Sequence, residues 1–503
     1  MEVSFFYTST LVFFISIFLI LKFQKRSKRT NLPPSPPSLP IIGHLHLLKT
    51  PLHRTLQFLA EKYGPIMLLR FGIRPTLIVS SPSIVEEIFT KNDLAFANRP
   101  KSIALKLLQY NYTTLGFSPY GNHWRNLRRV ATVHIFSSLN IFHSSNIWTE
   151  EVRLSAKQLF ANSNKQNPEK WTELNLTDLF HELVYNVMMR MAAGKRWSKS
   201  ADSFKVVNTL IDTYDFIPIL RWIGFGGYKY EKEMRSLQDE RDKFLQDLID
   251  EGKINRNESN SIDEGKKTVV QSLLALQEAD PQYYTDEIVK GMIQIMFTAG
   301  TDISAVAMLW TMSLLLNHPE VLEKAKTEMK NQISPAGKLI DDSDLPNLPY
   351  LRSIINESLR LCPPAPLLLP HFTSEDCTIN GYNVPKETTV LINTWAIHRD
   401  PNVWEEATKF KPERFEGIEV GNSDQLGFKF VTFGKGKRSC PGSFLAVRFI
   451  TLTIGTLIQS FDWKRLGPEL VDMQEKPGLT MHRDKPLVAF YKPCHQLPME
   501  NNP

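Results

Sequence analysis

The 503-residue sequence predicts a mainly α-helical globular protein with small β-sheets, held behind a single N-terminal transmembrane helix. Most segments after residue 80 place apolar side chains at helical spacing, whereas β-prone runs are short and few. A chain that is 42% hydrophobic can bury a large core, and its 32 prolines are spread rather than gathered in a low-complexity tract. Composition and periodicity therefore both favour a folded body.

The predicted transmembrane helix covers the uncharged run Val3 to Leu21, which would span roughly 28 Å, close to the hydrocarbon thickness of a bilayer. A cleaved signal peptide is the alternative, but no basic segment precedes the run and no small-residue cleavage site follows it. We assign residues 1–22 to this anchor. Basic residues come next, and by the positive-inside rule they place the remaining chain in the cytosol: Lys22, Lys25, Arg26, Lys28 and Arg29.

A basic and proline-rich hinge, residues 23–40, is expected to follow the anchor. Its prolines favour an extended, semi-rigid spacer, and a ligand for a proline-binding domain is the alternative. Residues 41–503 would then form one folded body. The four cysteines show no Cys-x-x-Cys spacing, which favours a reduced, cytosol-facing protein, although a pair between Cys362 and Cys377 stays open.

Within this body, two short β-prone runs surround a turn in residues 68–79, and a helix is expected to begin after Ser81. Residues 101–120 are irregular, and loops of that length in compact domains are often functional, so we expect a pocket wall or lid there. Trp124 and Arg128 are four residues apart and would share one face of a helix. Their indole N–H and guanidinium together suit a carboxylate.

A long helix is predicted from Thr285 to Asn317, because Thr-Asp-Glu is typical of a helix start and Asn-His-Pro of a helix end. At 1.5 Å per residue it would be roughly 45 Å long and would cross the whole domain. A second membrane span is the alternative, but Lys290 and Asp302 interrupt the apolar run. Asp302 lies among apolar neighbours, where a carboxylate is costly unless it has a partner or a task.

Residues 433–442 read Phe-Gly-Lys-Gly-Lys-Arg-Ser-Cys-Pro-Gly and set Cys440 among glycines and cations. The charges of Lys435, Lys437 and Arg438, with the N–H groups at the start of the next helix, are expected to favour the thiolate. The thiolate is the form of cysteine that binds metals. The glycines let the backbone approach a bulky planar group or adopt positive φ. A structural cysteine in a turn is the alternative.

This loop resembles the haem-binding signature Phe-x-x-Gly-x-Arg-x-Cys-x-Gly of the cytochrome P450 monooxygenases through Phe433, Gly436, Arg438, Cys440 and Gly442. Ala-Gly-Thr-Asp at 299–302, Glu-x-x-Arg at 357–360 and Phe-Lys-Pro-Glu-Arg-Phe at 410–415 follow the order of that family, and the whole is similar to plant microsomal members of the isoflavone-hydroxylase-like group. The resemblance implies the cytochrome P450 fold and haem b (iron protoporphyrin IX). It also implies hydroxylation with O₂ of a small apolar plant metabolite, phenylpropanoid, isoflavonoid or terpenoid.

The resemblance further implies a role for each matching residue. Cys440 would be the axial iron ligand. The other cofactor-binding residues would be Trp124, Arg128, His371, Arg438, Gly436 and Phe433. Protons would be managed by Asp302, Thr301 and Ser304, and backbone room at Gly300 would admit dioxygen. A structural network clamping the ligand loop would consist of Glu357, Arg360 and Arg414. The substrate pocket would be lined by Phe297, Ala299, Ile303, Ala365, Leu367 and Leu369.

One position departs from the family pattern. Where its members usually carry a threonine after the acid, this chain has Ile303, so a hydroxyl is missing. Thr301 and Ser304 point about 160° and 100° away from Ile303 around a helix of 3.6 residues per turn, so neither simply replaces it.

The sequence contains no dinucleotide fingerprint and no flavin module, so electrons would come from a partner, NADPH-cytochrome P450 reductase, at the endoplasmic reticulum membrane. A net charge of +6 and the lysines beside Cys440 suit an acidic docking partner, and no nucleic-acid partner is expected. Two alternatives stay open. One is a reductase-independent isomerase or dehydratase on the same fold, and the other is a non-catalytic haem-binding protein.

Overall fold

The computed structural model describes residues 7, 10, 12–16, 31–164, 170–196, 213–217, 227–258, 267–333, 338–418 and 425–494. Most of the predicted anchor, and the basic residues that follow it, lie outside these residues. The described part is mostly helical with small sheets, as predicted.

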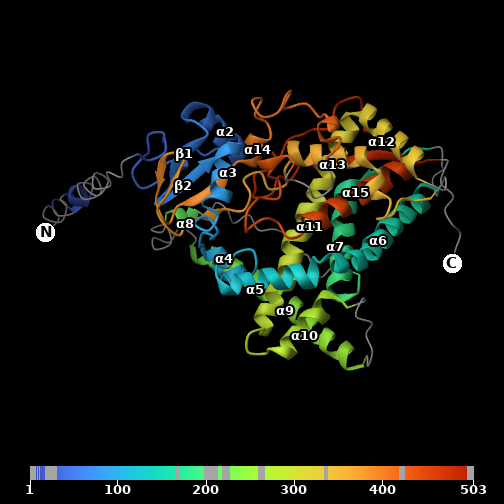
Figure 1. Ribbon diagram of the computed structural model, residues 1–503, viewed down its shortest axis with the longest axis horizontal. Helices are drawn as coiled ribbons and strands as arrows, with labels where there is room; N and C mark the ends of the chain where they lie inside the picture. Colours follow the sequence, from blue (N-terminus) through green and yellow to red (C-terminus); the bar gives the residue numbers. More distant parts are fainter. Residues whose placement is uncertain are drawn as a thin grey trace.

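The long helix α11, Asp286–Asn317, runs through the middle of the molecule (Figure 1). It follows Thr285 and ends before His318, as predicted. Helices α7 (Leu176–Ala193), α13 (Pro349–Leu361) and α15 (Ser443–Ser460) pack against it. Among the described helices, α11 and α15 are long and apolar enough to cross a membrane, yet 72% and 67% of their most apolar windows are buried inside the protein. The apolar side chains of these two helices therefore belong to the core.

The remaining described helices surround this centre: α2 (Leu52–Tyr63), α3 (Pro82–Thr90), α4 (Ile103–Leu108), α5 (Asn122–Val130), α6 (Ser138–Asn164), α8 (Thr213–Phe216), α9 (Gly227–Glu258), α10 (Val269–Ala279), α12 (Pro319–Gln332) and α14 (Thr394–Ile397). Local sequence explains several boundaries. Pro82 occupies the first turn of α3, where its missing N–H costs nothing. Thr268 and Gln271 form a capping box at the start of α10.

A four-stranded sheet lies toward the N-terminal side of the molecule, in the order β1-β2-β7-β4 (Figure 1). Strands β1 (Ile66–Phe71) and β2 (Arg74–Val79) form the predicted hairpin, while β7 (Thr389–Ile392) runs parallel to β2 and antiparallel to β4 (His371–Phe372). A second sheet joins β3 (Thr172–Asn175), β9 (Val488–Pro493) and β8 (Phe461–Lys464), and β5 (Cys377–Ile379) pairs with β6 (Tyr382–Val384).

All four cysteines are free, so the possible pair between Cys362 and Cys377 does not form. Part of the proline-rich hinge contacts the folded body: the Leu68 N–H donates to the Pro34 carbonyl at 2.9 Å, and the Asn383 N–H donates to the Asn31 carbonyl at 2.8 Å. Residues 31–40 therefore lie against the sheets.

The irregular stretch 101–120 contains the short helix α4, which the sequence did not predict. It forms because Ser102 caps its N-terminus and its apolar side packs near Met234 of α9. After it, three consecutive residues have left-handed φ angles of 45°, 52° and 64°: Tyr110, Asn111 and Tyr112. Such backbone is costly for residues other than glycine. It is held by the Tyr110 hydroxyl, which donates to Asp242 at 2.9 Å.

Candidate active site

The cysteine-bearing loop before α15 is closed by its own backbone. The Cys440 N–H donates to the Phe433 carbonyl at 2.9 Å. Gly436 has a φ of +68°, and a side chain there would come within 2.5 Å of Asp93 Oδ1. Asp93 also accepts a hydrogen bond from the Lys437 N–H at 3.0 Å. Glycine at 436 is thus required by its backbone angle and by Asp93, a residue that no sequence pattern indicated.

Residue Cys440 is exposed as a whole, although protein atoms surround its thiol closely. This burial raises the pKa of the Cys440 thiol, and the Gly442 N–H and the Arg128 charge lower it only in part. Burial outweighs these charges for the metal-free thiol, and the prediction that the cations of the loop favour the thiolate stays a prediction for the metal-bound sulfur. Arg438 instead directs its guanidinium to the Ala97 carbonyl at 2.6 Å. A metal ion on the sulfur would supply the missing positive charge, because a coordinating thiol is deprotonated.

One buried arginine and two partly buried ones gather beside this loop: Arg99, Arg128 and Arg438. Arg438 lies 4.5 Å from the ring centre of Trp124, and Arg128 donates to the Ser439 carbonyl at 2.7 Å. Burial and the Arg438 charge lower the pKa of Arg99 to about 9, and burial and the Arg128 charge lower the pKa of Arg438 to about 10. Within the described ranges, no carboxylate pairs with any of the three.

Partly or fully buried cations whose partners are carbonyls fit a ligand that brings carboxylates, such as haem b with its two propionates. Trp124 belongs to the same cluster, although its Nε1–H already donates to the Leu115 carbonyl at 3.1 Å. The sequence reading missed Arg99, which donates to the carbonyls of Leu369 and Pro370 at 2.8 and 2.7 Å. In the sequence, Arg99 is distinguished only by its place before a proline, and this signal is too weak to predict a role in cofactor binding.

His371 lies on β4 and is 4% exposed. Burial and the charges of Arg99 and Arg438 hold its pKa well below the usual range, so the imidazole is neutral. Its Nδ1 lies 2.9 Å from the Phe96 carbonyl, and because a carbonyl only accepts, the single proton is on Nδ1. Nε2 is then an acceptor, which cannot donate to a propionate. The role of His371 as a propionate partner stays a prediction.

Replacing Arg438 by leucine should speed haem loss about tenfold or more, because one hydrogen bond to a charged group contributes about 1.5–3 kcal/mol. His371→Asn can keep the bond to Phe96 and should change haem loss less than about threefold, since it removes no donor to a carboxylate. Haem transfer to a scavenging apoprotein measures both rates. Equal losses in the two variants would show that His371 does hold a propionate.

One face of α11 carries side chains that are not buried. Ile295, Ala299 and Ile303 are not buried and are spaced four residues apart, so they share this face. Thr301 is buried, and its hydroxyl donates to the Phe297 carbonyl one turn earlier at 2.5 Å. Ser304 is buried as well. The residue at 303 is thus the one in this turn that presents its side chain to open space, and it carries no hydroxyl.

Gly300 and Phe297 lie on other sides of α11. A side chain at Gly300 would come within 3.1 Å of Met188 Sδ, so α7 fills the space beside this glycine. Gly300 is itself only partly buried, and the expectation that backbone room there admits dioxygen stays a prediction. The Phe297 ring is buried and lies 5.9 Å from the Phe244 ring of α9. Its role as a pocket residue stays a prediction.

Asp302 has two side-chain partners from the segment between β8 and β9. Its Oδ2 accepts a hydrogen bond from the Thr480 hydroxyl at 3.0 Å and lies 3.1 Å from His482 Nε2. Residue 302 is 9% exposed. The acid that the sequence placed among apolar residues therefore has partners, and neither partner was predicted.

The structure brings Glu357, Arg360 and Arg414 together, as predicted. Arg360 binds both carboxylate oxygens of Glu357, at 2.6 and 2.7 Å, and both side chains are fully buried. The Arg414 Nε lies 3.4 Å from Glu357. Arg360 also donates to the Ala407 carbonyl at 2.7 Å, and the Lys411 N–H donates to Glu357 at 2.9 Å. The network therefore fastens the segment before the cysteine loop to α13.

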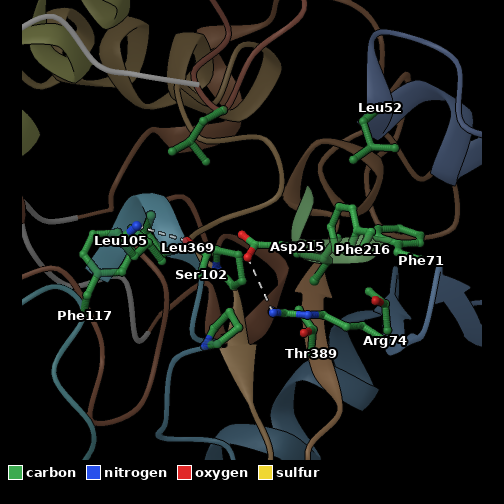
Figure 2. A pocket seen from close by; sticks show the side chains of 15 residues that line it. Leu52, Phe71, Arg74, Ser102, Leu105, Phe117, Asp215, Phe216, Leu369 and Thr389 are labelled. Atoms are coloured by element: carbon green, nitrogen blue, oxygen red, sulfur yellow. Dashed lines mark hydrogen bonds and ion pairs between the residues drawn. The ribbon is translucent and has the colours of Figure 1, made fainter. Parts of the chain in front are cut away.

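A small cavity of about 60 Å³ lies between the four-stranded sheet, α4 and α8 (Figure 2). Leu369, one of the predicted pocket residues, lines it, and Arg74 faces Asp215 across it at 3.7 Å. Ala365 is partly exposed, whereas Leu367 is buried in the cluster formed by α2 and the sheet. The roles of Ala365, Leu367 and Leu369 toward a substrate stay predictions.

A loop cysteine beside arginines that have carbonyl partners but no carboxylate fits a haem-thiolate protein. The cytochrome P450 family model matches residues 33–490, and the chain therefore belongs to the cytochrome P450 family. It is 48% identical to Cytochrome P450 81Q32 of Catharanthus roseus, over 97% of this chain and 96% of the relative, and 44% identical to the isoflavone 2'-hydroxylase of Glycyrrhiza echinata, over 96% of both chains. A zebrafish cytochrome P450 solved with abiraterone superposes with a TM-score of 0.73 and 26% identity, covering 88% of this chain and all of that one.

These findings confirm the fold family, the haem b cofactor and the monooxygenase class, and they do not favour the isomerase or the non-catalytic alternative. The chain is a haem-thiolate monooxygenase that is similar to plant hydroxylases.

Proposed function

We propose that this monooxygenase hydroxylates a small, mostly apolar plant secondary metabolite of the phenylpropanoid, isoflavonoid or terpenoid class, with electrons from NADPH through a membrane-bound cytochrome P450 reductase. The observation that carries the substrate class is the 44% identity to an isoflavone hydroxylase over nearly the full length of both chains. The exposed Lys437 beside Cys440 supports an acidic docking partner on this side.

When bound, haem b supplies dioxygen activation and insertion of one oxygen atom into a C–H bond. The chain's own residues hold it and shape the space around it. Cys440 would bind its iron, and Arg99, Arg128 and Arg438, with Trp124, would hold its propionates. Ile295, Ala299 and Ile303 would present an apolar surface to the substrate, and the Asp302 carboxyl would take part in proton delivery. Phe297, Ala365, Leu367 and Leu369 extend the pocket.

A turnover assay tests this function. The purified protein, reconstituted with a plant reductase and NADPH, should hydroxylate at least one isoflavone, lignan or terpenoid from a panel, and omission of reductase should abolish the product. Product formed without reductase would favour the isomerase instead. A thiolate-type spectrum with no turnover on any class would contradict the proposed substrate range.

We also propose a single-pass topology in the endoplasmic reticulum membrane, with residues 1–22 as anchor, residues 23–40 as hinge and residues 41–503 as the catalytic domain facing the cytosol. The uncharged run from Val3 to Leu21 and the basic residues after it support this arrangement.

Deleting residues 1–29 should release the protein from membranes, at least partly, and leave its haem spectrum unchanged, because the described core contains none of these residues. Sedimentation of expressing-cell membranes, with the spectrum of each fraction, measures both. Failure of the shortened chain to bind haem would show that the anchor contributes to the fold.

The missing hydroxyl at Ile303 should make the wild type consume more NADPH than it converts into product, with the difference released as hydrogen peroxide. Ile303→Thr should raise the ratio of product to NADPH, because its side chain lies on the open face of α11. The same assay on one substrate, with NADPH, peroxide and product all measured, checks this. If the wild type couples NADPH oxidation tightly to product formation, and Ile303→Thr has no effect or lowers the product yield, then Ile303 only shapes the substrate pocket.

A further inference from the structure

The contacts of Asp302 connect the middle of α11 to the molecular surface. Its Oδ2 lies 3.0 Å from the Thr480 hydroxyl and 3.1 Å from His482 Nε2. Thr480 is 5% exposed, while the side chain of His482 is 36% exposed. One carboxylate oxygen is thus in contact with a buried hydroxyl and with an imidazole that water can reach.

The segment that carries these two residues is fixed at several points. The Trp310 Nε1–H donates to the Met481 carbonyl at 2.6 Å, and the Met481 N–H donates to the Pro364 carbonyl at 2.8 Å. Arg483 donates to the hydroxyl of Ser313 at 2.8 Å, and Ser313 lies further along α11 than Asp302. The segment therefore holds its place on α11 by bonds that do not involve Asp302. Thr480 and His482 can be altered without releasing it.

Two nearby hydroxyls of α11 already bond backbone carbonyls. The Thr301 hydroxyl donates a hydrogen bond to the Phe297 carbonyl, the Thr298 hydroxyl donates one to the Gln294 carbonyl at 3.0 Å, and Ile303 has no hydroxyl. Oxygen insertion consumes protons that come from solvent, so a route from water to the site is needed. Among the described residues around Asp302, His482 is the proton-carrying side chain that water can reach and that also contacts the buried carboxylate.

We propose that His482 and Thr480 supply and hold the proton of Asp302 in this chain, with His482 as the residue that takes protons from bulk water. In the step, the Nε2–H bond of the protonated imidazole breaks and an O–H bond forms at Asp302 Oδ2. This leaves a neutral imidazole and a neutral carboxylic acid, and the imidazole then regains a proton from water. The Thr480 hydroxyl keeps Oδ2 oriented. The inference rests on the proposed monooxygenase function and adds two positioning residues to it.

The test compares four variants in the reconstituted enzyme with one accepted isoflavone. His482→Gln can donate to Asp302 but cannot carry a proton through, and Thr480→Val removes the hydroxyl while Thr480→Ser restores it. His181→Gln, which removes a half-buried histidine of α7 that bonds the Thr177 carbonyl, is the matched control. NADPH oxidation, peroxide release and product are measured in H₂O and in D₂O. Affinity for 4-phenylimidazole, read from the haem spectrum, reports the shape of the pocket.

His482→Gln should slow NADPH oxidation about tenfold, less than the full contribution of a positioned proton donor because water can partly replace it. It should also raise the peroxide fraction and the D₂O effect. Thr480→Val should do the same more weakly, with rescue by Thr480→Ser. Phenylimidazole affinity should stay within about twofold and His181→Gln should match the wild type, since the segment keeps its other bonds.

Two outcomes would overturn the inference. The first is an unchanged D₂O effect and peroxide fraction in both His482→Gln and Thr480→Val. The second is a change in phenylimidazole affinity alone, which would show that the contact of Asp302 with Thr480 and His482 only maintains the shape of the pocket. A urea-unfolding cycle of Asp302→Asn with His482→Gln gives an independent readout, because non-additive losses are expected only if the two side chains interact in solution. If the wild type itself shows no reductase-dependent NADPH oxidation, the proposed function fails, which this design separates from failure of the His482 route.

Discussion

Replacing Cys440 by serine should abolish monooxygenase activity and remove the thiolate-type Soret band of the reduced carbon monoxide complex. The loop keeps its backbone bonds in this variant, since the Cys440 N–H and not the sulfur closes it. What is lost is the anionic sulfur that donates electron density to the iron. The difference spectrum and the haem content of the purified variant measure the effect.

Cys377→Ser is the matched control, because Cys377 lies on the small β5–β6 hairpin and its sulfur has only a weak contact with the Val384 carbonyl at 3.9 Å. This variant should keep the wild-type spectrum. A Cys440→Ser protein with an unchanged spectrum would end the assignment of Cys440 as the axial ligand.

Replacing Glu357 by glutamine should lower the free energy of unfolding by about 3–5 kcal/mol, the usual cost of removing one partner from a buried ion pair. Arg360 would remain fully buried with only carbonyl oxygens around its charge. Loosening of the segment that contains Ala407 and Lys411 should also reduce haem content. Urea unfolding with linear extrapolation measures the loss of stability.

Glu413→Gln makes the same chemical change on the surface and serves as its control. The Glu413 side chain is 49% exposed and pairs with Lys324, so its loss should cost less than about 1 kcal/mol. Similar losses in the two variants would show that burial does not set the strength of the Glu357 network.

Short-range rules were enough for the long helix α11, for the β1–β2 hairpin and for the cysteine loop. The caps and the apolar period of α11 act within a few residues, and the glycines around Cys440 serve the loop that contains it. Glu357 and Arg360 meet because three residues on a helix bring them to one face. Each of these features depends on neighbours in the chain, which a sequence displays directly.

Tertiary packing decided the partners of the charged groups. Arg99 meets Arg438 across the chain, and Asp302 meets Thr480 although 178 residues separate them. The same packing raised the pKa of the Cys440 thiol and placed Met188 beside Gly300. The pKa of a titratable group and the free space beside a glycine both depend on the atoms that surround them in the folded chain. The order of residues determined where the helices and the cysteine loop lie along the chain, and only the folded arrangement determined which side chains share their protons and charges.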